Sequence, residues 1–105
     1  MNILIVDDHT GYIESLKSIV SYAFEDVKNL EITKSLNCEN AIQTIKHRVA
    51  INKTFDLAII DYIMPPYNEE GINNGGDLYT YLKKVMPSCK TVINTGILED
   101  FTLFE

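Results

Sequence analysis

Two short, almost wholly apolar segments, each followed directly by acidic residues, dominate the pattern of the chain. Residues 57–60 read Leu-Ala-Ile-Ile and run into Asp61, and residues 3–6 read Ile-Leu-Ile-Val and run into Asp7 and Asp8. Runs of this length suit strands that are buried on both faces, as in a parallel sheet flanked by helices. In such sheets the strands present their carboxyl ends at one edge, where ligands bind. If the two strands are neighbours and parallel, the pattern predicts that the three carboxylates converge there.

Three further segments have the periodicity of amphipathic helices. They cover residues 10–24, residues 38–50 after Asn37, which can cap the helix, and a segment that begins at Asp77 and is closed by Pro87. The residues predicted to face the sheet are Ile13, Leu16, Ile19, Val20, Ala23 and Phe24 in the first helix, Ala41, Ile42, Ile45 and Val49 in the second, and Leu78, Tyr81, Leu82 and Val85 in the third.

The remaining segments complete an α/β pattern. Residues 30–36 alternate well enough for a strand at the sheet edge, and residues 91–94 form a fourth strand. Residues 66–76 are rich in turn formers and have no periodicity, which indicates a loop. Residues 99–105 have the apolar spacing of the start of a fourth helix.

Length and composition limit the classes of protein that fit. The 105 residues suit one domain, and 46% hydrophobic with 23% charged residues is ordinary for a globular protein. A net charge of −6 argues against nucleic-acid binding by this chain, because phosphate contacts need clustered Lys and Arg. No segment is long and apolar enough for a membrane span or a secretion signal, so we expect a cytoplasmic chain. Cys38 and Cys89 form no CxxC motif and are expected to be free thiols.

The predicted carboxylate cluster indicates a cation site. Carboxylates a few ångströms apart repel one another, so without a counter-ion at least one should hold its proton more tightly than a free Asp. Oxygen-only ligands favour Mg²⁺ or a similar hard cation, and with it one carboxylate can attack a phosphoryl group. The alternative is that Asp7 and Asp8 only cap the helix that follows them, since Asp is a favoured N-cap residue. The position of His9 beside the acidic pair suggests a catalytic role, but a polar residue at the entrance of that helix is the interpretation that fits best.

The order and spacing of these features resemble the receiver domain of two-component response regulators. The features are the acidic pair after the first strand, Asp61 followed by Met64-Pro65, and Thr95 after Val92, Ile93 and Asn94. The resemblance implies a three-layer flavodoxin-like parallel sheet in the order 2-1-3-4 with helices on both faces. It also implies that Asp61 accepts a phosphoryl group from a sensor histidine kinase or a histidine phosphotransfer protein. Asp7, Asp8, Asp61 and the Ile63 carbonyl would bind Mg²⁺, and the Thr95 hydroxyl would meet the phosphoryl group.

The carboxyl-terminal part of the sequence departs from that family. A receiver domain continues with a fifth parallel strand, which carries a Lys that binds the phosphoryl group, and a fifth helix, whereas no Lys or Arg follows Lys90 here. We therefore expect residues 1–105 to be a receiver domain truncated at the start of its fourth helix. The missing strand would leave residues 91–94 as an exposed edge that can pair two copies into a homodimer. A fold-back of residues 97–105 across this edge is the alternative.

Three functions are compatible with the sequence. The first is phosphorylation of Asp61, with Mg²⁺-dependent self-phosphorylation and slow autodephosphorylation at most, rather than enzymatic turnover. The second is a receiver-like interaction module that neither switches nor accepts phosphate. The third, a phosphatase of the haloacid dehalogenase type, needs a second Asp two residues after the nucleophile. His9 follows Asp7 and Thr10 follows Asp8 at that spacing, which argues against it.

Overall fold

A computed structural model of the chain describes residues 1–94 and, as main chain only, residues 101–104. Within these residues, five strands form one sheet in the order β2-β1-β3-β4-β5. Their bounds are β1 Asn2–Val6, β2 Glu31–Ser35, β3 Leu57–Asp61, β4 Lys90–Asn94 and β5 Phe101–Phe104. The first four strands pair with one another in parallel, which confirms the predicted α/β class and the order 2-1-3-4.

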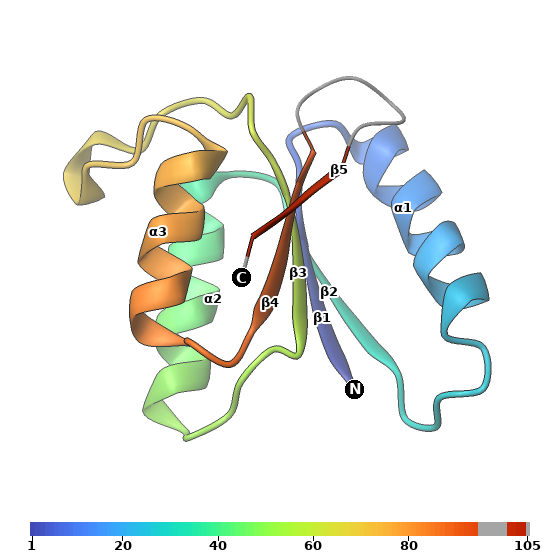
Figure 1. The fold of residues 1–105 in the computed structure, drawn as a ribbon. Helices are drawn as coiled ribbons and strands as arrows, with labels where there is room; N and C mark the ends of the chain where they lie inside the picture. Colours follow the sequence, from blue (N-terminus) through green and yellow to red (C-terminus); the bar gives the residue numbers. More distant parts are fainter. Residues whose placement is uncertain (95–100, 105) are drawn as a thin grey trace.

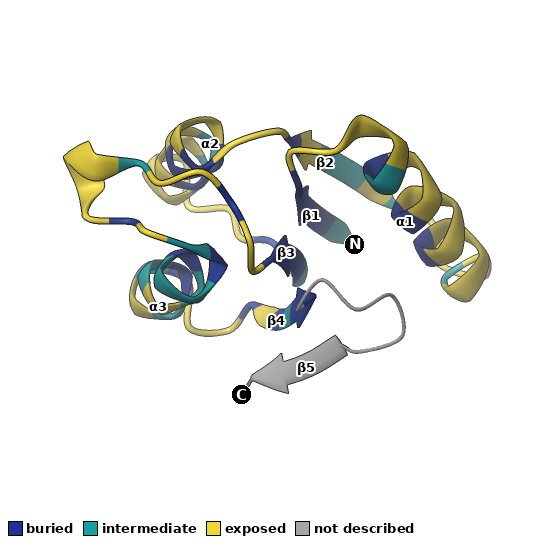
Figure 2. Ribbon diagram, turned by 90° about the horizontal axis from the view of Figure 1, so that it is seen from above, coloured by how far each residue is buried: buried dark blue, intermediate teal, exposed yellow. Residues whose placement is uncertain are grey.

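Helices cover the sheet on both faces, as a flavodoxin-like fold requires (Figure 1). The helix α1 (Thr10–Ala23) lies on one face, and α2 (Cys38–Ala50) and α3 (Gly75–Val85) lie on the other. The buried apolar side chains form two clusters, one between the sheet and α1 and a larger one between the sheet and the α2–α3 pair. Figure 2 shows that burial concentrates on the inner sides of the helices and along the central strands. No helix in the described part of the chain is long and apolar enough to cross a membrane.

Helix capping explains where two of the helices begin. Asn37 caps α2 as predicted, because its side chain accepts a hydrogen bond of 2.7 Å from the Asn40 N–H. The third helix begins two residues before the predicted Asp77, because Asn74 is its N-cap and accepts a hydrogen bond of 3.0 Å from the Asp77 N–H. The preceding loop is less irregular than predicted and contains a short 3-10 helix, η1 (Asn68–Glu70).

Most, but not all, of the predicted inward residues are buried or half-buried. The exceptions lie near the carboxyl ends of α1 and α2: Ile19 is 63% exposed, Val49 is 41% exposed, and Ala23 is also exposed. Cys38 and Cys89 are both free thiols, as predicted, and both are buried. The prediction that all apolar positions of the helical stripe face the sheet is therefore wrong at these three residues.

The carboxyl-terminal segment differs from the sequence-based prediction. Residues 101–104 were expected to lie in a fourth helix, but they form β5, which pairs with β4 in antiparallel orientation. The register runs from Thr91 opposite Phe104 to Asn94 opposite Phe101. The prediction of a free β4 edge is therefore wrong, and the homodimer through that edge loses its structural basis. The fold-back alternative is the one that the main chain adopts, because it pairs backbone groups that a bare edge would leave open.

Candidate functional site

The sheet register places the predicted carboxylates together. Val6 of β1 is the partner of Ile60 of β3, so Asp7 and Asp61, the next residue of each strand, lie side by side at the carboxyl edge. Ligand atoms of Asp7, Asp8, His9 and Asp61 all lie within 4.8 Å of one another. The predicted convergence of the three carboxylates is confirmed, and the cluster contains a histidine that the prediction left out.

Asp7 is fixed by main-chain hydrogen bonds, and one of its carboxylate oxygens has no partner among the residues that the structure describes. It is 1% exposed, and its N–H donates a hydrogen bond of 3.0 Å to the Ser35 carbonyl. Its Oδ1 accepts a hydrogen bond of 2.9 Å from the His9 N–H. Its Oδ2 is buried and has no hydrogen-bond partner in the described part of the chain. A buried carboxylate oxygen without a partner is costly, which indicates that a ligand belongs there.

Neither Asp7 nor Asp8 caps α1, so the helix-capping alternative is wrong. The N-cap of α1 is His9, and its side chain makes no capping hydrogen bond. Asp7 instead accepts the N–H of His9 across a tight turn before the helix. The carboxylates of both aspartates therefore belong to the acidic cluster and not to the N-terminal cap of α1.

Asp61 is buried beside Asp7 and has an altered acidity. It is 7% exposed, and its Oδ1 accepts a hydrogen bond of 3.2 Å from the Ile63 N–H. Burial, followed by the charge of Asp7, raises the pKa of Asp61, although the Ile63 hydrogen bond acts in the opposite direction. This agrees with the prediction that one carboxylate of a metal-free cluster holds its proton more tightly than a free Asp.

His9 has a larger part in the site than the sequence indicated. Its Nδ1 lies 3.0 Å from Oδ1 of Asp8 and 3.2 Å from Oδ1 of Asp7. The hydrogen bond to Asp7, followed by the charge of Asp8, raises the pKa of His9. The adjacency of His9 to two aspartates was visible in the sequence, but the direction of its ring toward them depends on the turn into α1.

The loop after Asp61 is fixed to neighbouring elements by its main chain. The Tyr62 N–H donates a hydrogen bond of 2.8 Å to the Asn94 carbonyl, and the Gly75 N–H donates one of 2.8 Å to the Tyr62 carbonyl. A Cβ at Gly75 would lie 2.7 Å from Tyr62 Cα and closer still to the Asp61 carbonyl. Gly75 therefore lets the start of α3 approach the phosphoacceptor candidate, a requirement that the sequence analysis missed. The predicted Thr95 lies outside the described residues.

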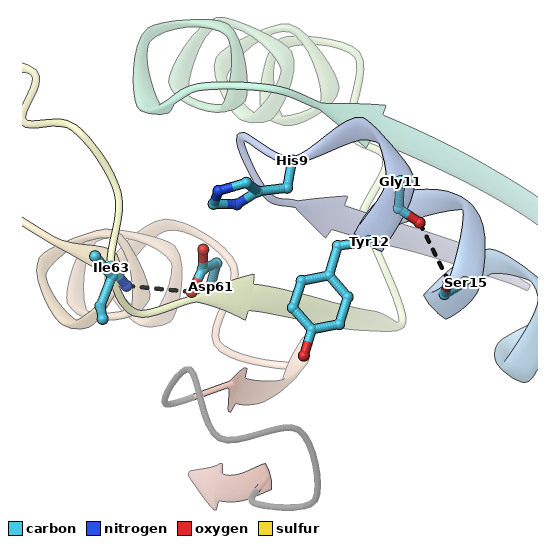
Figure 3. Close-up of a pocket in the computed structure, with 6 residues that line it drawn as sticks. All are labelled: His9, Gly11, Tyr12, Ser15, Asp61 and Ile63. Carbon is cyan, nitrogen blue, oxygen red and sulfur yellow. Dashed lines mark hydrogen bonds between the residues drawn. The ribbon is translucent and has the colours of Figure 1, made fainter.

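A cleft opens beside Asp61. It has a volume of about 500 Å³ and is lined by His9, Gly11, Tyr12, Ser15, Asp61 and Ile63. Figure 3 shows the His9 ring reaching from the start of α1 toward Asp61, with the Tyr12 ring below it. The Tyr12 hydroxyl is buried and has no hydrogen-bond partner in the described part of the chain. The face of α1 formed by residues 11, 12 and 15 thus borders the site, although its residues carry no motif that would have identified them.

The donor set fits a divalent cation. Two oxygens on opposite sides of Mg²⁺ at about 2.1 Å each are about 4.2 Å apart. The ligand atoms of the cluster lie within 4.8 Å of one another, so they need to draw together only slightly. The unpartnered Oδ2 of Asp7 supplies an oxygen that nothing else in the described chain uses. The acidic cluster is therefore able to hold a metal ion.

Comparison with known proteins supports the fold. No protein-family model and no curated protein sequence matches the chain. A solved structure of RcsB from Salmonella enterica serovar Typhimurium, bound to promoter rprA in the presence of phosphomimetic BeF₃⁻, matches 94% of this chain and 76% of that chain. The TM-score is 0.63 and the sequence identity is 20%. The chain therefore has the receiver fold of response regulators, in agreement with the resemblance seen in the sequence.

Proposed function

We propose that the chain is a phosphoacceptor receiver domain of a two-component signalling system. In this proposal Asp61 takes a phosphoryl group from a sensor histidine kinase or a histidine phosphotransfer protein in the cytoplasm. One observation carries the proposal. On a receiver fold, Asp61 lies at the carboxyl edge of the sheet with ligand atoms of Asp7 and Asp8 within 4.8 Å, and one buried oxygen of Asp7 has no hydrogen-bond partner among the described residues.

The reaction assigned to Asp61 is a phosphoryl transfer. A carboxylate oxygen of Asp61 attacks the phosphorus, the bond from phosphorus to the donor breaks, and an acyl phosphate remains on Asp61. The Ile63 N–H holds Oδ1 of Asp61 and so fixes the plane of the carboxylate. Asp7, Asp8, Asp61 and the Ile63 carbonyl would hold Mg²⁺, which neutralises charge on the phosphoryl oxygens. The expected activity is self-phosphorylation with slow autodephosphorylation, not turnover of a substrate.

Thr95 is proposed to contact the phosphoryl group through its hydroxyl. The support is its position in the sequence directly after Asn94, which is the partner of Asp61 in the β3–β4 ladder. We further propose that residues 1–105 belong to one receiver domain.

A non-switching interaction module is the second candidate function. It is favoured by β5, which pairs with β4 in antiparallel orientation and contains no Lys, whereas the family has a parallel strand with a phosphate-binding Lys. In this case the receiver fold would present a surface to a partner without phosphorylation of Asp61.

Phosphoryl-donor labelling separates the two functions. The wild-type chain, Asp61→Asn and a control, Asp26→Asn, are incubated with acetyl phosphate and Mg²⁺ and analysed by intact-mass spectrometry. Asp26 is exposed and lies just beyond the other end of α1, so its loss should not alter the reaction. The proposal expects Mg²⁺-dependent labelling of the wild type and the control but not of Asp61→Asn. A folded wild type that is not labelled would indicate the interaction module, and equal labelling of Asp61→Asn would refute Asp61 as the phosphoacceptor.

A further inference from the structure

His9 contacts the carboxylate cluster through both its main chain and its side chain. Its N–H donates to Oδ1 of Asp7 at 2.9 Å, while Nδ1 of the ring lies 3.2 Å from the same oxygen and 3.0 Å from Oδ1 of Asp8. The side chain is 69% exposed, so packing does not hold it there. The ring nitrogen thus lies beside two carboxylates, where it can belong to the same set of ligand atoms.

We propose that His9 is a nitrogen ligand of the metal site and that the site consequently favours a divalent transition cation, Mn²⁺ in particular, over Mg²⁺. The inference rests on the proposed function, because it concerns the cation of the same site. Its structural basis is that a ring nitrogen of His9 and carboxylate oxygens of Asp7, Asp8 and Asp61 all lie within 4.8 Å of one another.

The composition of this donor set decides the choice of cation. Mg²⁺ prefers oxygen ligands and retains water in place of weaker ligands, whereas imidazole is a good ligand for transition metals. Mn²⁺, like Mg²⁺, binds carboxylates in octahedral oxygen sites. Unlike Mg²⁺, it binds more tightly when one ligand is an imidazole nitrogen. A site with three carboxylates and one imidazole therefore favours Mn²⁺ over Mg²⁺. A site with three carboxylates alone would discriminate less between the two cations.

A second observation points to a cation independently of His9. Asp7 is 1% exposed, and its Oδ2 is buried without a hydrogen-bond partner in the described part of the chain. The contacts of His9 involve Oδ1 of Asp7, so they leave this oxygen unsatisfied. A metal bound between Asp7, Asp8 and Asp61 would satisfy Oδ2 and bring a ring nitrogen of His9 into coordination range.

The test compares metal binding by the wild type, His9→Gln and His47→Gln. The sequence contains two histidines, and His47 lies exposed in the last turn of α2, which makes it the matched control. The free Mn²⁺ concentration is followed by electron paramagnetic resonance, and Mg²⁺ affinity is measured by competition with Mn²⁺. Pulsed spectra of bound Mn²⁺ report coupling to ¹⁴N when an imidazole is a ligand. Circular dichroism establishes that each variant is folded.

The proposal expects ¹⁴N coupling in the wild type and in His47→Gln, and its loss in His9→Gln. It also expects His9→Gln to weaken Mn²⁺ binding about tenfold, a difference of about 1.4 kcal/mol, with a much smaller change for Mg²⁺. Absence of imidazole coupling in the wild type, or an equal loss of both affinities in His9→Gln, would overturn it. If Mg²⁺ binds and Asp61 is labelled while ¹⁴N coupling is absent, this inference fails and the proposed function stands. If no divalent cation binds the folded wild type and Asp61 is not labelled, both fail.

Discussion

Gly75, the first residue of α3, packs directly against the main chain of Asp61. A Cβ at this position would meet the Asp61 carbonyl oxygen and would lie 2.7 Å from Tyr62 Cα. The Gly75 N–H also donates a hydrogen bond of 2.8 Å to the Tyr62 carbonyl, so the two segments are in contact through their backbones. The position of the candidate phosphoacceptor therefore depends on a residue without a side chain fourteen positions later in the sequence.

The first prediction is that Gly75→Ala destabilises the protein by about 1–3 kcal/mol, because backbone atoms cannot rotate away as a side chain could. The added methyl group would also displace the start of α3 from the main chain of Asp61, and this displacement should weaken phosphorylation of Asp61. Urea denaturation and acetyl phosphate labelling measure the two effects. Gly11→Ala is the control for stability, since nothing outside the neighbouring helix backbone lies within 4 Å of the added Cβ and Ala is favoured over Gly within a helix by about 1 kcal/mol. Unchanged stability of Gly75→Ala would contradict the packing argument.

The second prediction concerns the pH dependence of stability in metal-free buffer. Because burial and Asp7 raise the pKa of Asp61 in the folded state above its ordinary value of 3.8, the ionised carboxylate destabilises the fold. The loss of folding stability is absent below the pKa that Asp61 has in the unfolded chain. It grows as pH rises from the unfolded pKa to the folded pKa, and it reaches its full size above the folded pKa. Asp61→Asn should therefore be more stable than the wild type at pH 7, and the two should converge below pH 3.8.

Thermal melts of both proteins across a pH series in EDTA measure this difference. Asp26→Asn, which replaces an exposed carboxylate away from the cluster, should show no comparable pH-dependent gain. A wild type more stable than Asp61→Asn at neutral pH without metal would mean that the interactions of the Asp61 carboxylate outweigh its burial and its repulsion by Asp7.

The third prediction is that Asp8→Asn loses Mg²⁺ affinity while its metal-free stability is unchanged or raised, by an amount of about 1 kcal/mol. Asp8 adds negative charge to the cluster, and neither Asp8 nor Asp7 is the N-cap of α1, so the helix should not depend on its carboxylate. Titration calorimetry with Mg²⁺ and thermal melts in EDTA provide the two measurements. Strong destabilisation with intact Mg²⁺ affinity would show that Asp8 acts in folding rather than in cation binding.

The fourth prediction is that deletion of residues 101–105 causes self-association. The deletion removes β5 and leaves the β4 backbone without its antiparallel partner, which creates an edge able to pair with another copy. Sedimentation velocity should show the full chain as a monomer of 11.9 kDa and the shortened chain as larger species at high concentration.

A charge on the newly exposed edge should reverse this effect. Val92, in the middle of β4, is half-buried, and Val92→Lys in the shortened chain should restore the monomer because edge lysines oppose strand pairing. If the shortened chain is also a clean monomer, β5 does not protect the β4 edge. Self-association of the full chain through β4 would contradict the pairing between β4 and β5.

The central elements and the carboxylate cluster were predictable from the sequence because they depend on local patterns. Apolar runs that end in Asp7 and Asp61 indicate strands buried on both faces, and the carboxyl ends of parallel strands necessarily share an edge. Asn37 caps α2 through a hydrogen bond to a residue three positions away, an interaction that sequence spacing specifies. The raised pKa of Asp61 also follows from its burial at the end of a central strand and from the nearby charge of Asp7.

Three features depended on the tertiary structure, because the local sequence was compatible with more than one conformation at each: the start of α3, the strand β5 and the orientation of the His9 ring. Asn74 and Asp77 are both suitable helix starts, and the helix begins after Asn74, where Gly75 fits against Asp61. The spacing of Phe101 and Phe104 suits a helix, but the open backbone groups of β4 make a strand the better solution. His9 resembled a polar residue at a helix entrance until the turn from β1 into α1 placed its ring against Asp7 and Asp8. For the start of α3 and for β5, the deciding contact joins segments that are distant in sequence. For His9, the deciding feature is the path of the turn from β1 into α1.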